Sequence, residues 1–467
     1  MAGYLTTTEL DSALIAFENT YPSICSRIEL PEKTHESRTC WALRIGSNFP
    51  IKSSTVLFTA GVHAREWGGP DSCINFIADL LEAYAANQGL QFGSYMVSAA
   101  KVQSLVDELT IIVFPCSNPD GRAFDMQGTP QTPEVDSSIW RKNRRPATPP
   151  SSCLGVDCNR NQDFLWDSDK YLADSAAQVA SSPDPCSYTY RGPSASSEPE
   201  TRNIAWLLDS FPVDWYLDIH AFTGVMLFPW GHAPNQSYDT TKNFANPVWD
   251  GQRGTQGALY GEYMAPDDLA ELETAANAVA DAMNQSKANA RGHYLVAQSF
   301  FLNVGGSSPA YYPTTGTNDD FAFGRHLVNS LKRKVRGFTL EFGFEHLGDL
   351  ARSFHPEWSE MEKNILDVTA GMLEFCRLAQ IRSKPTISVP EIVGQILGGV
   401  ASDGGGILIL PSGKIIRIPP RQPVLIQILE GIAAYTAAVE LKGDTGSQLR
   451  TAALNAVQQI IAEELSH

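Results

Sequence analysis

The sequence predicts an α/β fold, with a mixed, twisted central sheet flanked by helices and a small α+β module at the C-terminus. Apolar, strand-like runs alternate with amphipathic, helix-like segments as far as Arg377, which is typical of a sheet covered by helices. The pattern changes after Arg377, and this change predicts the separate module. With 467 residues and 43% hydrophobic content, the chain is long enough for a large core and more than one domain.

The expected elements follow from these patterns in chain order. The N-terminal threonines predict a capped helix opened by Thr7 or Thr8, and Ser197-Glu-Pro-Glu200 is a capping-box pattern that opens a helix through Leu208. Strands are expected near Ile28, at residues 41–45, 56–60 and 109–114, within 209–222 and at 335–344. Further helices are expected at residues 70–85, 266–285 and 356–378.

Three segments are expected along the chain: a large domain at residues 1–380, a linker at 381–390 and an accessory module at 391–467. In the module, Ile407–Ile418 predicts a hairpin, and two helices are expected at residues 423–439 and 448–465. The module carries no recognisable catalytic constellation. It is interpreted as packing on the large domain or making a homo-oligomer contact, with targeting or substrate docking as the alternative.

Composition excludes some classes of partner. The net charge of -17 and the pI near 5.0 argue against nucleic-acid binding, which needs a basic surface. The basic segment Lys332–Arg336 is interpreted as a solvated helix end or the start of a strand. The sequence contains no run of eighteen apolar residues, so it predicts no membrane-spanning helix. The N-terminus lacks the pattern of a secretory signal, and this favours a cytoplasmic location.

Residues that suit a divalent metal site lie at the ends of strand-like runs. His63-Ala-Arg-Glu66 follows one apolar run, and His220 and Glu341 end two others. Because the ligand crevice of an open α/β sheet lies at the carboxyl ends of its strands, these side chains could converge on one zinc ion, with Glu341 as a general base. The alternative is a core histidine at His220 and a structural ion pair at Glu341. Glu345 and His346 would be fallback ligands.

Six motifs in order carry a resemblance to a known family. They are His63-Ala-Arg-Glu66-Trp67, Ser117-Asn-Pro-Asp-Gly121, Trp140-Arg-Lys-Asn-Arg144, Val156-Asp-Cys-Asn-Arg-Asn161, Asp218-Ile-His220 and Phe338-Thr-Leu-Glu341. Over about residues 4–377, the chain resembles the zinc carboxypeptidases of the A/B type. The resemblance implies that family's fold and one zinc ion per chain.

Carried over residue by residue, the resemblance also implies roles at the metal. His63, Glu66 and His220 would bind zinc, and Glu341 would activate the water. Asp157 would orient His63 from outside the ligand set.

Other roles implied by the resemblance concern the substrate. Arg144 would stabilise the oxyanion, and the pair Asn159-Arg160 would bind the terminal carboxylate of a peptide. Tyr312 would close over the bound terminus, although Tyr311 is adjacent and the assignment could slip by one residue. Arg65 is a further candidate for substrate binding.

Asp319 aligns with the base of the pocket that would receive the C-terminal side chain. An aspartate there favours lysine or arginine through charge complementarity, unless Asp319-Asp320 is a solvated turn. Residues 231–292 are expected to contain an enlarged loop before an Ala-rich helix, and residues 324–336 a second extension. Such loops often decide which substrates enter an active site.

The cysteines favour an oxidising compartment, whereas the N-terminus favours the cytoplasm. Cys153 and Cys186 stand where the resemblance implies a disulfide, which would suggest a secreted protein. Cys73 and Cys376 fall on apolar helix faces and are expected to be buried thiols.

Taken together, the sequence predicts a zinc metallocarboxypeptidase that favours basic C-terminal residues. Its partners are expected to be peptides or small acyl amino acids, without nucleic acid or membrane. One alternative is a hydrolase of N-acyl amino acids or modified peptides on the same zinc site. The other is an inactive peptide-binding protein that keeps the fold.

Overall fold

The computed structural model describes residues 3–47, 54–127, 139–255, 259–301, 312–383, 406–409 and 415–418. The chain divides into two compact units, Met1–Ser383 and Lys384–His467. All the candidate site residues belong to the first unit. In the described part of the chain, no helix is both long and apolar enough to span a membrane.

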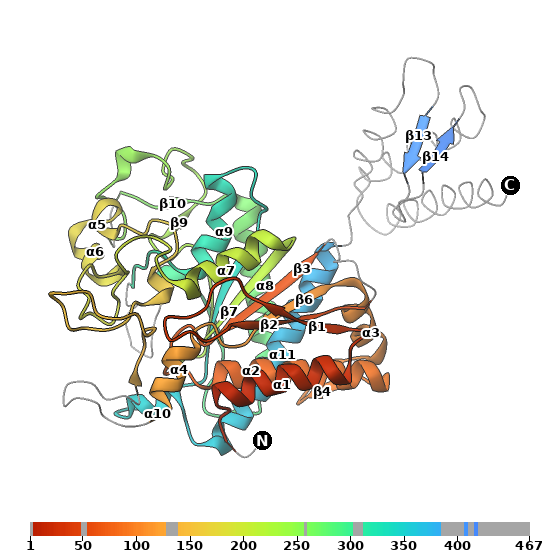
Figure 1. The fold of residues 1–467 in the computed structure, drawn as a ribbon. Helices are drawn as coiled ribbons and strands as arrows, with labels where there is room; N and C mark the ends of the chain where they lie inside the picture. Colours follow the sequence, from red (N-terminus) through yellow and green to blue (C-terminus); the bar gives the residue numbers. More distant parts are fainter. Residues whose placement is uncertain are drawn as a thin grey trace. The chain divides into compact units, whose positions relative to one another are not determined.

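A mixed central sheet organises the first unit (Figure 1). Within the described residues it has eight strands, in the order β1-β2-β6-β3-β7-β12-β8-β11. These are β1 (Cys25–Glu29), β2 (Trp41–Ile45), β3 (Thr55–Ala60), β6 (Thr110–Phe114), β7 (Val213–Ala221), β8 (Val225–Phe228), β11 (Leu295–Gln298) and β12 (Arg336–Phe342). Strands β6, β3, β7 and β12 run parallel, and antiparallel pairs flank them on both sides. The expected mixed sheet is confirmed.

Helices and short strand pairs complete the first unit. The helices are α1 (Thr7–Thr20), α2 (Gly68–Ala86), α3 (Ala99–Glu108), α4 (Pro119–Asp125), α5 (Ser168–Tyr171), α6 (Asp174–Ala180), α7 (Pro199–Ser210), α8 (Pro266–Ser286), α9 (Asn318–Val328), α10 (Leu350–Phe354) and α11 (Trp358–Ser383). Short 3₁₀ helices are η2 (Cys158–Arg160), η3 (Pro247–Trp249) and η4 (Ser299–Phe301). The small pairs are β4 (Leu90–Phe92) with β5 (Tyr95–Val97), and β9 (Asn235–Gln236) with β10 (Glu262–Tyr263).

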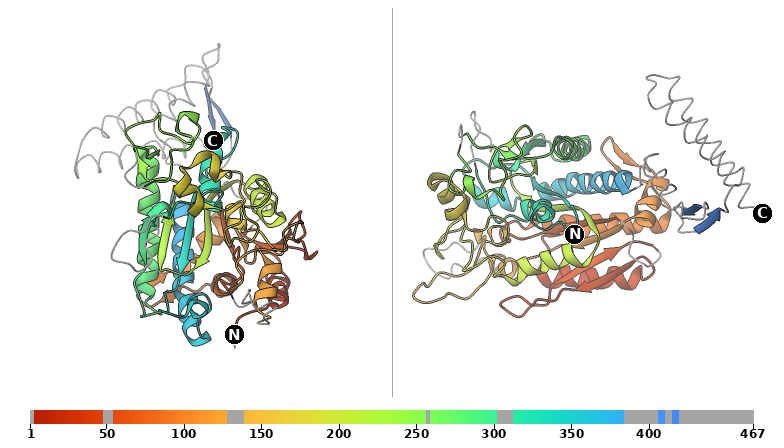
Figure 2. Two further views of the ribbon diagram at one scale, coloured as in Figure 1. Left: turned by 90° about the vertical axis from the view of Figure 1, so that its left-hand side faces the viewer. Right: turned by 90° about the horizontal axis from the view of Figure 1, so that it is seen from above.

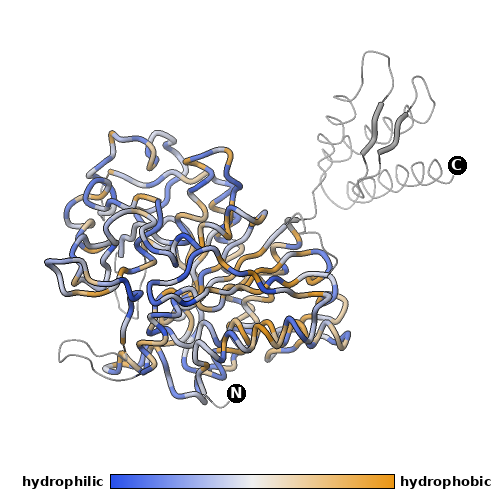
Figure 3. The backbone as a smooth tube through the Cα atoms, in the orientation of Figure 1, coloured by the Kyte–Doolittle hydropathy of each residue, from blue (hydrophilic) through white to orange (hydrophobic). Residues whose placement is uncertain are grey.

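Both faces of the sheet are covered, because side chains of a strand alternate between its faces. In β3, Val56 and Phe58 join the core cluster that includes residues of α1, α2, α3, α8 and α11, whereas Leu57 joins the cluster under α7. Every residue of β3 is buried. Figure 2 shows the helices on either side of the sheet, and Figure 3 shows hydrophobic residues concentrated along its central strands.

Both expected helices, α1 and α7, are present, but the predicted capping box at Ser197 is wrong. Helix α1 begins at Thr7, one of the two predicted positions, and its N-cap is Thr6, which forms a capping box in which its side chain and that of Glu9 satisfy each other's backbone N–H groups. The pattern at Ser197 does not form a capping box, since the N-cap of α7 is Glu198 and makes no side-chain capping bond. The Ser197 hydroxyl donates to the Glu198 carboxylate instead, at 2.6 Å.

The end of the large domain also differs from the prediction. Helix α11 continues to Ser383, so residues 381–383 of the predicted linker are helical, because the chain keeps helix-forming residues through this stretch. Beyond it, β13 (Gly406–Ile409) and β14 (Ile415–Ile418) pair antiparallel, as expected for the hairpin. The remaining linker, the helices at 423–439 and 448–465, and the oligomer contact all fall outside the described residues.

Candidate active site

Three neighbouring strands place the site at one edge of the sheet. His63 follows β3 after a turn at Gly61, whose φ of +67° suits glycine, while His220 and Glu341 lie near the carboxyl ends of β7 and β12. In the parallel pair of β7 and β12, Glu341 stands directly beside His220. The carboxyl ends of these parallel strands meet, which is why residues so far apart in sequence come together.

The two histidines and Glu66 form a buried donor cluster. His63 Nδ1 lies 2.7 Å from Glu66 Oε1, and His220 Nδ1 lies 3.1 Å from Glu66 Oε2 and 3.1 Å from His63 Nδ1. Each residue offers one ligand atom within 4.8 Å of the others. Two imidazole nitrogens and one carboxylate are the donors that a catalytic zinc ion uses, so the cluster fits that metal.

A carboxylate outside the cluster holds each imidazole. His63 Nε2 lies 3.2 Å from Asp157 Oδ1, and His220 Nε2 lies 2.9 Å from Asp218 Oδ2. Each ring is therefore turned so that its Nδ1 faces the cluster. Asp157 stands where it was expected. Asp218 was missed as a partner, although its spacing of two residues from His220 on a strand already placed both side chains on one face.

Electrostatics divide the carboxylates of the site into two kinds. Burial raises the pKa of Glu66, but the charges of His63 and His220 outweigh it, so the pKa of Glu66 lies below its ordinary value. The pKa of Glu341 is raised to about 7, chiefly by burial, and the neighbouring Glu66 charge adds to the rise. Glu341 lines the same cavity as His63 and Glu66. A carboxylate with a pKa near neutrality is suited to accept and return a proton.

Arg141, not Arg144, lines this cavity. Arg141 Nε donates to Asp157 Oδ2 at 2.9 Å, and although burial alone would lower the pKa of its guanidinium, the Asp157 charge raises it. The Arg144 guanidinium lies over the Phe124 ring, 3.8 Å from its centre, and its Nε contacts Glu36 at 3.3 Å. The assignment of the oxyanion cation to Arg144 is therefore corrected to Arg141 of the same motif.

The candidate groups for a terminal carboxylate meet in the cavity. Asn159, Arg160, Tyr312 and Arg65 all line it. The Arg160 Nη2 lies 3.3 Å from the Tyr312 hydroxyl, and the Arg160 charge lowers the pKa of Tyr312. Burial lowers the pKa of Arg65 to about 10, and its guanidinium carbon stands 4.0 Å from the ring centre of Phe354. Tyr311, the alternative to Tyr312, lies outside the described residues.

Asp319 lines the cavity, and its neighbour Asp320 is turned elsewhere. The Asp319 carboxylate accepts a hydrogen bond from Ser299 Oγ at 3.0 Å. Asp320 accepts the backbone N–H of Gly231, at 3.1 and 3.0 Å to its two oxygens. Burial raises the pKa of Asp319 to about 6, and the Asp320 charge adds to the rise. Both carboxylates are buried, so Asp319-Asp320 is not a solvated turn.

The fallback ligands, two cysteines and the basic segment lie outside the donor cluster. His346 contacts Glu360 at 3.1 Å, and neither His346 nor Glu345 lines the cavity, so the fallback ligands are not brought to the cluster. Cys73 and Cys376 are buried free thiols, as predicted. The basic segment at residues 332–336 leads into β12, which begins at Arg336, so the predicted start of a strand is confirmed. Its basic side chains also pair with acids: Lys332 with Asp209, Arg333 with Asp214, Lys334 with Asp268 and Arg336 with Glu271.

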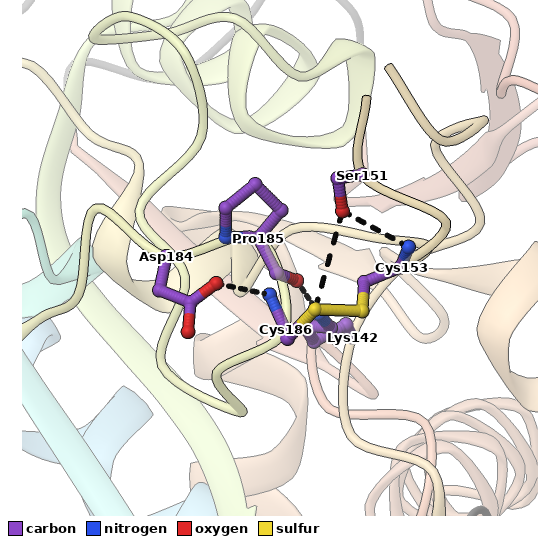
Figure 4. Close-up of a disulfide and its surroundings, with 6 residues drawn as sticks. All are labelled: Lys142, Ser151, Cys153, Asp184, Pro185 and Cys186. Carbon is purple, nitrogen blue, oxygen red and sulfur yellow. Dashed lines mark hydrogen bonds between the residues drawn. A yellow bond between two sulfur atoms is a disulfide. The ribbon is translucent and has the colours of Figure 1, made fainter. Parts of the chain in front are cut away.

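The predicted disulfide between Cys153 and Cys186 is present (Figure 4). It joins the segment before Asp157 to the segment before α7. Lys142 reaches the same place and donates to the carbonyl of Pro185 at 2.8 Å. The disulfide thus braces the irregular backbone that carries Arg141 and Asp157.

A second group of possible metal donors in the described residues has a different character. His35, Glu198 and Glu200 bring ligand atoms within 4.8 Å of one another. Glu198, however, already contacts Arg145 Nη1 at 2.8 Å and the Asn143 amide at 2.8 Å. These donors satisfy the carboxylate without a metal ion.

Comparison with known proteins agrees with this geometry. The family model of the zinc carboxypeptidases matches residues 10–370. Zinc carboxypeptidase A 1 of Drosophila melanogaster is 31% identical over 248 residues, covering 50% of this chain and 49% of its own. Human carboxypeptidase B is 27% identical over 340 residues, covering 72% of this chain and 63% of its own. The matches thus span about half to two thirds of these relatives.

Solved structures show the same fold. The carboxypeptidase A of Helicoverpa armigera superposes with a TM-score of 0.56 at 22% identity, over 82% of this chain and 75% of that one. Bovine thrombin-activatable fibrinolysis inhibitor, solved with a tick carboxypeptidase inhibitor, superposes with a TM-score of 0.56 at 19% identity, over 80% of this chain and 97% of that one.

Proposed function

Because the chain belongs to the zinc carboxypeptidase family, we propose that it is a zinc-dependent metallocarboxypeptidase that hydrolyses the C-terminal peptide bond of peptides. One observation carries this proposal: His63, Glu66 and His220 form a buried three-donor cluster in the cavity that Glu341 also lines. Zinc held there would polarise the scissile carbonyl and lower the pKa of water.

The chain's own residues supply the rest of the chemistry. Glu341 takes a proton from the attacking water and later delivers it to the departing amine. Arg141, fixed by Asp157, faces the negative charge that develops on the carbonyl oxygen. Asn159 and Arg160 bind the terminal carboxylate of the substrate. Tyr312 lies close enough to Arg160 to cover this bound carboxylate.

The replacement of Glu341 by Gln tests the role of this carboxylate. The variant and the wild type are both expected to hold one zinc ion per chain, because Glu341 is outside the donor cluster. Its turnover on peptides should fall by about 10³-fold, the loss of a general base. The measurements are metal content by elemental analysis and initial rates of peptide cleavage.

Three other results would contradict the proposed role of Glu341 or favour an alternative function. Full turnover in the Glu341→Gln variant would remove Glu341 as the base. Wild-type protein that holds zinc and binds peptides without cleaving them would support the inactive binding protein instead. Faster cleavage of N-acyl amino acids than of any peptide would favour the alternative hydrolase.

We further propose that the enzyme prefers lysine or arginine at the C-terminus. The support is the buried Asp319 carboxylate in the cavity, which would pair with a cationic side chain that leaves water. With its pKa at about 6, Asp319 is ionised above pH 6 and becomes neutral below it. The preference should therefore be complete above pH 7 and weaken as the pH falls through 6, while the substrate side chain stays charged.

Profiling all twenty C-terminal residues tests this preference, with an Asp319→Ile variant alongside the wild type. Rates on peptides ending in Lys or Arg should fall by about 10²- to 10³-fold in the variant, since a buried cation would lose its partner. Rates on peptides ending in Leu or Phe should rise, and they show that the variant is folded. An unchanged profile would discard Asp319 as the selector.

We also propose that the protein works in an oxidising compartment. The Cys153–Cys186 disulfide supports this, because such bonds persist where thiols are not kept reduced.

A further inference from the structure

A buried histidine outside the metal site lies behind the specificity pocket. His232 follows β8 and is fully buried, and no step of the proposed reaction uses it. Its Nε2 lies 2.8 Å from Glu262 Oε2, and its Nδ1 lies 3.5 Å from Asp320 Oδ2. The imidazole thus lies between a carboxylate of β10 and a carboxylate of α9.

Among the residues that the structure describes, His232 is the basic side chain that contacts both Glu262 and Asp320. Glu262 also accepts the N–H of Phe244 at 2.9 Å and contacts the hydroxyl of Tyr260. The next cation outward is Arg253, whose Nε lies 3.2 Å from the Tyr260 hydroxyl, but its Nη1 pairs with Asp250 at 2.7 Å. Arg253 therefore does not offset the charges on the side of Asp320.

Three buried carboxylates belong to this group: Glu262 at the Nε2 side of His232, Asp320 at its Nδ1 side, and Asp319, which is next to Asp320 in the chain and lines the cavity. Like charges that are buried together cannot all stay ionised without a nearby cation. A protonated His232 leaves a net charge of about -2 on the group, and a neutral His232 leaves about -3, counted from the ordinary charges of these side chains. Asp319 would be among the first to take up a proton, because its pKa is already raised.

We infer that His232 is a positioning residue for specificity: its imidazolium, held between Glu262 and Asp320, sustains the negative charge of Asp319 that receives a cationic C-terminal side chain. Burial opposes the charge on His232, but the hydrogen bonds to Asp320 and Glu262 outweigh it and raise its pKa. This inference rests on the proposed carboxypeptidase activity and its basic preference.

The enlarged loop at residues 231–292 supplies part of the charged group behind the pocket. Glu262 lies on β10, which pairs with β9 inside the segment 231–292. The backbone N–H of Gly231, next to His232, also fixes Asp320. The loop therefore contributes charge to the pocket, although His232 does not line the cavity.

The test compares His232→Gln with His326→Gln. His326 lies on α9, does not line the cavity, and has a lowered pKa, chiefly from burial, so it supplies no cation near neutral pH. The kcat/KM is measured from pH 5 to 9 on two peptides that differ only in a C-terminal Arg or Leu. In the wild type, the Arg/Leu ratio should rise through pH 6.

In His232→Gln, the midpoint of this rise should move up by about one pH unit, and the ratio at pH 6.5 should fall by about 10-fold. The rate on the Leu peptide should change by less than about three-fold, since it does not need the charge. His326→Gln should keep the wild-type midpoint. An unmoved midpoint in His232→Gln, or an equal loss on both peptides, would overturn the inference.

A second measurement does not depend on the variant folding. In wild-type protein labelled with ¹⁵N-histidine, NMR should show both ring nitrogens of His232 protonated at pH 7.5, and a neutral ring there would overturn the inference. A wild type without any preference for Arg contradicts the proposed specificity itself, and this is seen before any variant is compared.

Discussion

Arg141 and Arg144 come from one motif, but their guanidinium groups have different surroundings. That of Arg141 lines the cavity and pairs with Asp157, which also holds His63. That of Arg144 lies over the Phe124 ring. A cation stabilises developing charge only when it is aimed at the place where the charge appears, so only Arg141 is positioned for catalysis.

Paired alanine variants separate the two arginines. Arg141→Ala should lower kcat by about 10²- to 10³-fold, the usual loss of an oxyanion donor, while zinc content stays at the wild-type level. Arg144→Ala serves as the matched control and should change kcat by less than about three-fold. Steady-state kinetics on one peptide measures both, and a larger loss from Arg144→Ala would restore the original assignment.

Single residues also show how far sequence reasoning reaches. The meeting of the four site residues could be predicted because His63 and Glu66 follow one apolar run, while His220 and Glu341 end two others. Parallel strands bring such ends to one edge of the sheet. The choice between two arginines could not be made from periodicity, because Arg141 belongs to no regular element.

At the scale of elements, the N-termini of α1 and α7 differ in whether a capping box forms. Thr6, Thr7 and Thr8 are chemically equal candidates for the N-cap of α1. The deciding signal is Glu9, which stands three residues after Thr6 and completes the capping box with it. At Ser197 the same spacing gives no capping box, because the N-cap of α7 is Glu198 and the Ser197 hydroxyl donates to the Glu198 carboxylate. A local pattern can thus predict that a helix is present without predicting the side-chain bonds at its N-terminus.

Removal of the α1 cap should cost measurable stability. Thr6→Ala deletes an acceptor for the Glu9 N–H and is expected to lower the free energy of unfolding by about 1 kcal/mol. Thr8→Ala, in the exposed first turn, should change it by less than about 0.5 kcal/mol. Urea unfolding followed by circular dichroism measures both variants. Equal effects would mean that the capping box does not stabilise α1.

At the scale of the whole molecule, the buried group of Glu198 and Glu200 joins distant segments. Asn143 donates to both carboxylates, His35 comes from the connection between β1 and β2, and Arg145 pairs with Glu198. Burial raises the pKa of Glu198, but the bonds to His35 and the other donors outweigh it and lower it. The pKa of Glu200 is raised to about 7, chiefly by burial. Glu198 is thus held charged, whereas Glu200 takes up a proton as the pH falls through about 7.

The free energy of unfolding should depend on pH because of the raised pKa of Glu200. Because the pKa of Glu200 rises on folding from an ordinary value of 4.5 to about 7, the folded state binds more protons between these values, and stability falls as pH rises through that window. Glu200→Gln mimics the neutral form, so it should raise the free energy of unfolding by about 1–3 kcal/mol at pH 8 and change it little near pH 4.5.

Glu198→Gln is the matched control, and its effect should have the opposite sign. The variant leaves His35 and Arg145 without their carboxylate, so it should destabilise the protein at pH 8, where the wild-type Glu198 is charged. Urea unfolding of both variants at pH 5 and pH 8 makes the comparison. If Glu200→Gln lost stability at pH 8, or if its effect were the same at both pH values, the raised pKa of Glu200 in the folded protein would be contradicted. The opposite signs cannot arise from burial alone, since Glu198 and Glu200 are equally buried. They require that the donors around Glu198 set its charge.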